Sequence, residues 1–444
     1  MIFNHPYRLT TIAAAGLIAL AACGKSEPPK TAAAAPPPTP VPVASPAMVV
    51  KIGHVGPLTG GIAHLGKDNE NGARLAIEQA NAKGLTIDGK KVTFELVAED
   101  DEANPQKGAT VAQKLVDAKV AGVVGHLNSG VTIAATKIYA DAGIPLVSGS
   151  ATNPDVTEKQ PGRTVFRTVG RDDQQGPAVA NYLVANNKPK VVALIDDATA
   201  YGEGLANEVE KSLKAAGIVV LAREKGNDKS TDFKAILTKL RARNPDAVFY
   251  GGMDATGGPL LKQARELGMK AVFAYGDGAC TDKMKELAGD AAEGLLCSQA
   301  GLPTQAASTS FLEAYKKRFN VDPILYSPFT YDAANLLIEA MVKANSAEPA
   351  KYLPVLQGIT MAGASGPISF DSKGDRKDAE MTIFTMKGGK IEPIAIIKGG
   401  KSQTLVEFMA AAAGGVTGAA QDAAKSAAGA AMDAAKSTAD AVKK

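Results

Sequence analysis

The chain of 444 residues has no tryptophan, three cysteines, four histidines and only 5% aromatic residues. Its formal net charge is +3, and no stripe of basic residues with interleaved aromatics occurs. Such a stripe is typical of proteins that bind nucleic acid, so we predict no nucleic-acid partner. No histidine or lysine stands beside a serine in a pattern that indicates an activated nucleophile, which argues against an enzyme.

Signatures of cofactors and metals are also missing. The histidines do not have the spacing of a metal site, and no Gly-x-Gly-x-x-Gly run opens the first predicted helix. Residues 61–68 nearly match a phosphate-binding loop, but Asp68 stands where that loop needs serine or threonine. We therefore expect no cofactor and no metal, a cleft loop over 61–68, and structural roles for His64 and His126.

Residues 1–22 have the features of a lipoprotein signal peptide. Arg8 precedes the apolar run from Ile12 to Ala22, which is too short to span a bilayer. Leu20-Ala21-Ala22-Cys23 resembles the lipobox of bacterial lipoproteins, which implies cleavage before Cys23 and lipidation of that residue. Gly24 then favours the outer membrane of a Gram-negative cell, although either membrane stays open. An ordinary secretory signal with an incidental cysteine is the alternative.

Low-complexity segments flank the body of the chain. Residues 23–48 are rich in proline and alanine, which predicts an extended spacer of roughly 3 Å per residue. Residues 409–444 consist mainly of alanine, glycine, serine, lysine and aspartate, and the motif at Asp422 recurs at Asp433. Alanine favours helix but buries little surface, so we expect a partly helical, mobile tail. The predicted mature protein is anchored by lipid on the periplasmic side of the cell envelope.

Two cysteines remain once Cys23 is assigned to the anchor. Cys280 follows one predicted strand, and Cys297 ends another apolar run in the same region. The periplasm is oxidising, so a disulfide between them is possible. The sequence does not fix their separation, and free thiols stay the alternative.

The body, residues 49–408, is longer than one hydrophobic core usually serves, which predicts two domains. Apolar runs of strand length alternate with amphipathic stretches, which predicts an α/β fold with parallel sheets and right-handed crossovers. The predicted strands are 49–55, 92–97, 120–124, 191–195, 218–221, 247–250 and 271–275, and the predicted helices include 69–83, 105–118, 200–216, 231–243 and 256–267.

Two polar turns, 125–130 and 148–154, each lie between a predicted strand and a predicted helix. Backbone N–H groups converge at such turns and favour an anion such as a carboxylate. Ligands of parallel α/β sheets bind at the carboxyl ends of the strands, where both turns lie. Ser129 and Thr152 could instead only cap helices. The pair of turns favours a receptor for a small acid.

The body resembles the periplasmic binding proteins for branched-chain amino acids, the Leu/Ile/Val family of ABC-transporter receptors. This resemblance implies a type I periplasmic binding protein with two Rossmann-like lobes, parallel sheets and a three-segment hinge. Lobe 1 would comprise 49–170 and 301–380, and lobe 2 would comprise 171–300 and 381–408. The resemblance extends from about 50 to 397 and rests on 71–77, 125–127, 151–154, 173–177, 201–205, 250–252 and 288–294.

The resemblance also assigns the two charged ends of the ligand. The ligand carboxylate falls on Ser129, Ser150, Ala151 and Thr152, in the two turns described above. Asp277 stands where the family has a glutamate for the ligand ammonium, and it is one methylene shorter. A plain turn aspartate before a glycine is the alternative for this position.

Other positions of the implied pocket differ from the family. Tyr201 matches a tyrosine that covers the ligand, whereas Met253 and Leu65 replace a tyrosine and a tryptophan. Met253 could also be a simple core residue. Ala103 and Asn128 replace a cysteine pair of the family, and we include Asn128 in the predicted site. These changes leave open which side chain the pocket accepts.

The sequence thus predicts a monomeric receptor that closes on an amino acid, most simply an apolar one, and delivers it to an ABC permease of the inner membrane. Within the same class, the ligand could be an amide, urea or an aromatic acid. An anchored sensor or scaffold that transports nothing is a separate alternative, and an enzyme is the least supported one.

Overall fold

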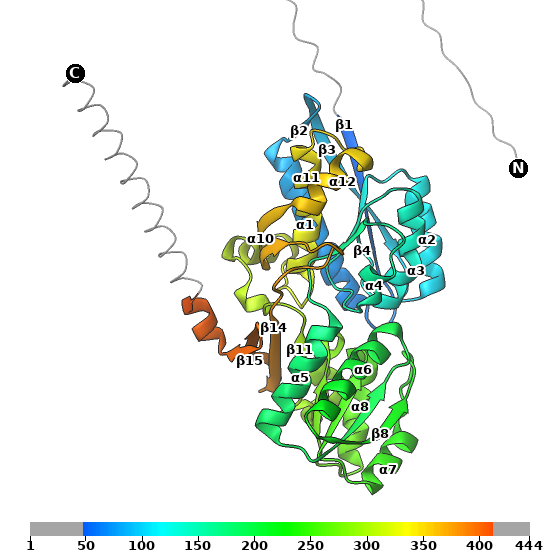
Figure 1. The fold of residues 1–444 in the computed structure, drawn as a ribbon, viewed down its shortest axis with the longest axis vertical. Helices are drawn as coiled ribbons and strands as arrows, with labels where there is room; N and C mark the ends of the chain where they lie inside the picture. The colour runs from blue at the N-terminus through cyan, green and yellow to red at the C-terminus, as the bar shows by residue number, and fades with distance from the viewer. Residues whose placement is uncertain (1–47, 412–444) are drawn as a thin grey trace, which may run out of the picture. The chain divides into compact units, whose positions relative to one another are not determined.

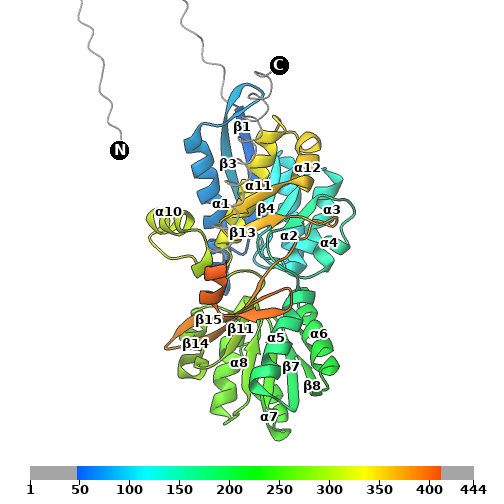
Figure 2. The same ribbon diagram turned by 60° about the vertical axis from the view of Figure 1, so that its left-hand side comes forward.

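The computed structural model describes residues 48–411. The predicted signal peptide, Cys23, almost all of the spacer and most of the tail lie outside these residues. The described chain forms two α/β lobes, each built on its own sheet (Figures 1 and 2), so the predicted two-lobe architecture is confirmed. None of the helices within 48–411 combines the length and the apolar character needed to cross a bilayer.

The first lobe contains a six-stranded sheet in the order β2-β3-β1-β4-β5-β6, in which only the β2–β3 hairpin is antiparallel. The small β12–β13 hairpin lies outside this sheet. The strands are β1 (Met48–Gly56), β2 (Thr86–Ile87), β3 (Lys90–Asp100), β4 (Gly122–Gly125), β5 (Leu146–Ser148), β6 (Val165–Arg167), β12 (Thr360–Gly363) and β13 (Gly366–Ser369). The helices are α1 (Ala63–Lys83), α2 (Pro105–Asp117), α3 (Ser129–Asp141), α4 (Asp155–Glu158), α10 (Thr309–Phe319), α11 (Ser327–Lys343) and α12 (Pro349–Gly358).

The second lobe contains an eight-stranded sheet in the order β16-β15-β14-β11-β10-β9-β7-β8. The strands are β7 (Val191–Asp196), β8 (Val219–Lys225), β9 (Ala247–Gly251), β10 (Val272–Tyr275), β11 (Leu296–Gln299), β14 (Met381–Lys387), β15 (Lys390–Lys398) and β16 (Lys401–Gln403). The helices are α5 (Asp172–Asn187), α6 (Ala200–Ala215), α7 (Lys234–Ala242), α8 (Asp254–Glu266) and α9 (Lys283–Ala288), with short 3-10 turns η1 (Asp277–Ala279) and η2 (Gly289–Ala292), and η3 (Thr304–Ala306) follows β11.

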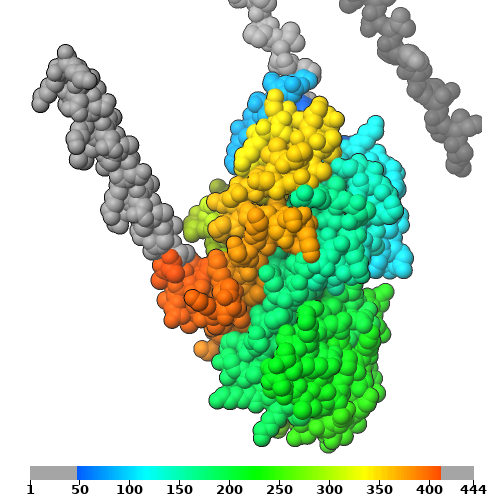
Figure 3. All heavy atoms as spheres, in the orientation of Figure 1, coloured from blue at the N-terminus to red at the C-terminus, as the bar shows by residue number. Residues whose placement is uncertain are grey.

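The second sheet is mixed, whereas the sequence predicted parallel sheets. Strands β7 to β11 pair in parallel, but β14, β15 and β16 are antiparallel. Tight turns at Gly388–Gly389 and at Gly399–Gly400 join β14 to β15 and β15 to β16, and all four glycines have positive φ. A two-residue turn can join only antiparallel strands. Figure 3 shows this late segment, in orange and red, beside the green second lobe.

The core explains why the central strands are continuously apolar. In β7, Val192 and Leu194 pack into one hydrophobic cluster with residues of α5 and α6. Ala193 and Ile195 point to the opposite face and pack into a second cluster with residues of α7, α8 and α9. Successive strand residues alternate between the faces of a sheet, so a strand covered on both faces needs apolar residues throughout.

The chain passes between the lobes three times, after β6, after β11 and before β14. These crossing segments are hydrogen bonded to one another. Gly170 N–H donates to Ala300 O at 2.8 Å, and Thr382 Oγ1 donates to Gly301 O at 2.7 Å. Short, adjacent connections of this kind let two lobes rotate as rigid bodies.

His54 on β1 is a buried titratable group inside the first lobe. It is 0% exposed, and neither ring nitrogen has a hydrogen-bond partner among the described residues. Burial lowers the pKa of His54 from 6.5 to about 4. The unfolded chain therefore takes up this proton at a higher pH than the folded chain. The contribution of His54 to stability is complete above pH 6.5 and is lost as the pH falls towards 4.

We predict that His54→Phe removes this pH dependence. Between pH 7 and pH 4, the free energy of unfolding of the wild type should fall by about 3 kcal/mol relative to that of the variant. Urea titrations of both proteins at several pH values measure the difference, and taking the difference cancels the contributions of all other groups. A difference that stays constant with pH would show that His54 is not protonated on unfolding.

Candidate functional site

The two polar turns lie at the carboxyl ends of β4 and β5, as predicted. Neither Ser129 nor Thr152 caps a helix, because Asn128 and Pro154 occupy the N-cap positions of α3 and α4. The capping alternative is therefore wrong for both residues. Ala151 is fully buried, and its carbonyl accepts a hydrogen bond from a buried arginine.

The side chains of these turns provide free hydroxyl donors. Ser129 Oγ accepts from Asn153 N–H at 3.2 Å, and Ser150 Oγ accepts from Asn69 Nδ2 at 3.0 Å. Thr152 Oγ1 is buried without a partner of good geometry among the described residues. Within 48–411, the hydroxyl protons of Ser129 and Ser150 are not donated to an acceptor, whereas the Thr152 hydroxyl lies beside the Asp172 carboxylate. The first two protons can therefore be offered to an anion.

Asp277 is the first residue of η1, directly after β10, and is 1% exposed. Its Oδ1 accepts from Tyr201 Oη at 2.7 Å and from Gln175 Nε2 at 3.1 Å. Its Oδ2 accepts from Tyr326 Oη at 2.7 Å. Burial raises the pKa of Asp277, and these three hydrogen bonds oppose the rise. Asp277 thus lies among tyrosines of both lobes, unlike a solvated turn aspartate.

Asp172 is a second buried acid beside Asp277, and it was not predicted from the sequence. It is fully buried at the start of α5, and neither carboxylate oxygen has a hydrogen-bond partner among the described residues. Burial and then the charge of Asp277 raise the pKa of Asp172 well above its usual range, and the nearby Thr152 side chain lowers it. Asp172 N–H also donates to Thr152 O at 2.9 Å. Two adjacent buried acids favour a cationic group between or beside them.

Tyr326 is positioned by Asp68, the residue that spoils the phosphate-loop match. The buried Asp68 carboxylate accepts the four consecutive backbone N–H groups of 324–327 at 2.8–3.0 Å. It also accepts from Tyr315 Oη at 3.0 Å. The conformation of the segment that places Tyr326 beside Asp277 therefore depends on the Asp68 carboxylate of α1.

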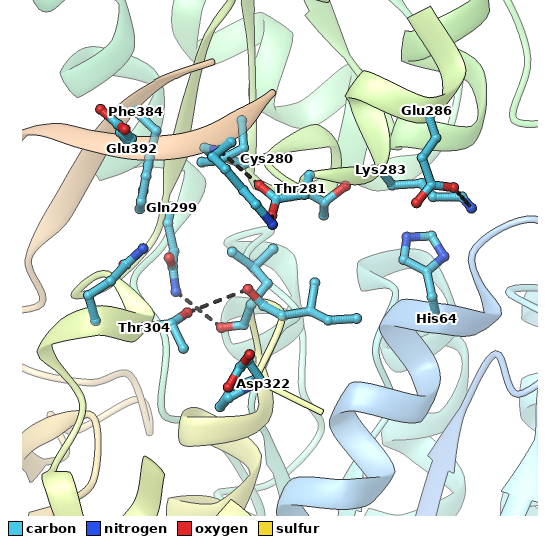
Figure 4. A pocket seen from close by; sticks show the side chains of 17 residues that line it. His64, Cys280, Thr281, Lys283, Glu286, Gln299, Thr304, Asp322, Phe384 and Glu392 are labelled. Atoms are coloured by element: carbon cyan, nitrogen blue, oxygen red, sulfur yellow. Dashed lines mark hydrogen bonds and ion pairs between the residues drawn. The ribbon is translucent and has the colours of Figure 1, made fainter. Parts of the chain in front are cut away.

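Two cavities lie where elements of both lobes meet. The first, of about 590 Å³, is lined by three predicted site residues, Asn128, Tyr201 and Met253. The second, of about 630 Å³, includes His64 and is shown in Figure 4. It contains none of the predicted amino-acid contacts, so we assign the site to the first cavity. The other predicted residues line neither cavity; they are Leu65, Ser129, Ser150, Ala151, Thr152 and Asp277. All six are buried, and Leu65 lies in an apolar cluster with Tyr326.

Polar contacts join the lobes on either side of Asp277. His64 Nε2 is 2.7 Å from Asp254 Oδ2, which also accepts from Thr281 Oγ1 at 2.7 Å. Asn153 Nδ2 donates to Ala200 O at 2.6 Å. These contacts can form only while the lobes are close together. His64 therefore connects the lobes.

His126 has a structural role within the first lobe, as the sequence analysis expected. Its Nδ1 is 3.0 Å from Asp101 Oδ2, and its Nε2 is 3.1 Å from Tyr139 Oη. All three side chains are fully buried. Within the described residues, no cluster of histidine, cysteine, aspartate and glutamate has the geometry of a metal site.

Cys280 and Cys297 form a disulfide with their Cα atoms 5.3 Å apart. Cys280 follows η1, and Cys297 lies on β11. The bond is buried, because both residues are at most 3% exposed. It therefore adjoins the turn that carries Asp277.

Sequence reasoning missed Asp172, Gln175, Asp254 and Tyr326. A signal existed for Asp172 and Asp254, since each begins a helix directly after a strand or crossing segment at the same edge as the predicted turns. Gln175 lies one turn further along the same helix as Asp172. Tyr326 had no comparable signal, because its segment follows no strand and is fixed by a distant carboxylate.

Comparison with known proteins places this geometry in a family. A family profile described as periplasmic binding protein matches residues 49–390. The Leucine-, isoleucine-, valine-, threonine-, and alanine-binding protein of Pseudomonas aeruginosa is 35% identical over 341 residues, which cover 76% of this chain and 90% of that protein.

Solved structures show the same similarity. A leucine-binding protein of Thermotoga maritima has a TM-score of 0.72 and 30% identity, covering 79% of this chain and 99% of its own. The branched-chain amino acid transporter substrate-binding protein of Streptococcus pneumoniae, in complex with isoleucine, has a TM-score of 0.70 and 29% identity over the same shares.

We predict that Asp68→Asn destabilises the protein by about 3 kcal/mol. The amide retains one acceptor oxygen but turns an NH₂ group towards backbone donors, and hydrogen bonds to a charged group contribute about 1.5–3 kcal/mol each. Chemical denaturation measures the loss. Asp322→Asn is the matched control, because Asp322 lies nearby in an exposed pair with Lys316. Equal stabilities of the two variants would contradict the role given to Asp68.

Proposed function

This chain belongs to the periplasmic binding protein family, and we propose that it is an extracytoplasmic receptor for an amino acid, branched-chain or similarly apolar. The ligand binds between the lobes, and the closed protein delivers it to an ABC importer. The relatives are named for binding amino acids, which supports recognition without turnover. The observation that carries the proposal is a pair of buried acids close to the hydroxyl groups of Ser129 and Ser150, whose protons have no acceptor within the described residues.

The first lobe receives the ligand carboxylate. Ser129 and Ser150 each have a hydroxyl proton with no acceptor within the described residues, and the buried Thr152 hydroxyl lies beside Asp172. Hydrogen bonds to a charged group contribute about 1.5–3 kcal/mol each, because a buried carboxylate has no water to compete for them. An anion at this place also lowers the desolvation cost of the buried donors.

The acids beside these hydroxyls receive the ligand ammonium. Asp277 already accepts three hydrogen bonds, whereas both oxygens of Asp172 lack a partner. A carboxylate pair offers about eight lone-pair sites, so an ammonium with three donors can be shared between them. Burial and then the charge of Asp277 raise the pKa of Asp172, and a positive charge beside both acids opposes these effects.

The apolar part of the remaining wall selects the ligand side chain, and Glu102, Asp197, Asp228 and Lys229 also line the cavity. Met253 and Tyr201 line the 590 Å³ cavity, and Leu65 packs in one hydrophobic cluster with Tyr326. Burial of a leucine-sized side chain contributes about 1.5–3 kcal/mol. After the cost of association, a dissociation constant of about 1 μM or lower, roughly −8 kcal/mol, is reasonable.

Closure follows from the division of these groups between the lobes. The hydroxyls belong to the first lobe, whereas Asp277 and Tyr201 belong to the second. A zwitterion satisfies both sets at once only when the lobes are together, so it shifts the population towards the closed form. A permease that contacts both lobes then distinguishes the loaded receptor from the empty one.

We predict that Asp277→Asn weakens amino-acid binding at least tenfold, because the amide has the same size but no charge. Isothermal titration with the twenty amino acids, their amides and aromatic acids identifies the ligand and measures the loss. Asp290→Asn, at a fully exposed acid of the same lobe, is the control. Unchanged affinity in Asp277→Asn, or tight binding of an acid without an amine, would overturn the assignment of the ammonium site.

The anchor forms part of the same proposal. Cys23, in a sequence that resembles a lipobox, carries lipid that keeps the receptor at the membrane. We predict that Cys23→Ser abolishes incorporation of radiolabelled fatty acid and releases the protein into the soluble periplasmic fraction. Ligand affinity should not change, since the spacer separates Cys23 from the folded body. Labelling that persists in Cys23→Ser would exclude this anchor.

A further inference from the structure

The disulfide between Cys280 and Cys297 adjoins the acidic half of the site from two directions. Cys280 N–H donates to Asp277 O at 2.9 Å, which closes η1. Only two residues therefore separate Asp277, which is proposed to bind the ligand ammonium, from the cross-linked Cys280. On the other side of the bond, Cys297 directly precedes Ser298 on β11.

Ser298 links β11 to Asp277 through Gln175. Ser298 Oγ accepts from Gln175 Nε2 at 2.9 Å. The same Nε2 donates to Asp277 Oδ1 at 3.1 Å. The cross-link thus joins the segment that carries the acid to the strand that orients one of its hydrogen-bond donors.

The backbone alone provides little connection at this place. Strands β9 and β10 pair through four residues, whereas β10 and β11 pair only through Ala274 and Leu296. The remaining polar link is long, because Ser298 Oγ is 3.4 Å from Tyr275 O. The pairing of β10 with β11 therefore ends before the turn that carries Asp277. Beyond this point, the disulfide connects the turn covalently to β11.

We propose that the Cys280–Cys297 disulfide is a positioning element of the ammonium site, which fixes Asp277 relative to Gln175 and the opposing hydroxyls. This inference rests on the proposed function, because it assumes that Asp277 contacts the ligand amine. Without the bond, η1 can move away from β11, and the carboxylate leaves the geometry that the amine requires. Binding of the carboxylate and the side chain, which depends on other elements, should be affected much less.

The test compares leucine with its 2-oxo acid, which has the same side chain and carboxylate but no ammonium. The ratio of the two affinities measures the ammonium site alone, because a general loss of stability lowers both affinities together. In Cys280→Ala/Cys297→Ala, we expect this ratio to fall at least fivefold. Leu240→Ala is the control, since Leu240 is buried in the same hydrophobic cluster but makes no contact assigned to the site.

Two further arms keep the test decisive if the alanine pair does not fold. Cys280→Ala/Cys297→Val restores apolar volume in the cluster. Reduction of the wild-type chain by a small dithiol breaks the S–S bond and transfers two electrons and two protons to give two thiols, while the reagent closes to a cyclic disulfide. Each folded form without the bond should show the lower ratio.

The outcomes separate this inference from the proposed function. A wild-type protein that does not prefer leucine over the 2-oxo acid contradicts the proposed ammonium site itself. A wild-type preference that is fully retained in a folded form without the disulfide overturns the positioning role and leaves the receptor function intact. A fall of the ratio in Leu240→Ala as large as in the cysteine variants would also overturn it.

Discussion

The proposed site depends on a carboxylate that accepts hydrogen bonds from both lobes. Asp277 of the second lobe accepts a hydrogen bond from the Tyr201 hydroxyl of its own lobe and another from the Tyr326 hydroxyl of the first lobe. A buried charge is tolerated only where hydrogen bonds replace water, so this acid is more stable with the lobes together. The two tyrosine hydroxyls meet this requirement at the beginning of η1. The polar turns of the first lobe face the same place.

A second carboxylate, remote from the ligand, makes this arrangement possible. Asp68 binds four backbone N–H groups and thereby fixes the segment that presents Tyr326. In the second lobe, the disulfide adjoins the turn that presents Asp277. Asp172 differs from both acids, because its oxygens lack partners among the described residues. Of the three acids, Asp172 is therefore the one whose charge a cationic ligand group would neutralise.

The sequence was informative wherever a property is local. The central strands are apolar throughout because both faces are covered, so their positions and the carboxyl-end turns could be predicted. The antiparallel strands β14 to β16 were missed, since the tight turn at Gly388 and Gly389 was not considered. The contacts of Tyr326 and Gln175 could not be predicted, because they depend on segments far apart in the chain. The bond between Cys280 and Cys297 stayed open for the same reason, as spacing alone does not give a distance.

The most direct test of the central claim is a crystal structure of the protein with bound leucine. The account predicts the leucine carboxylate within hydrogen-bond distance of the Ser129 and Thr152 hydroxyls. It places the ammonium within hydrogen-bond distance of Asp172 and Asp277, between lobes that are in contact. Leucine bound in the cavity beside His64, or bound in the assigned site with its ammonium facing away from both acids, would contradict it.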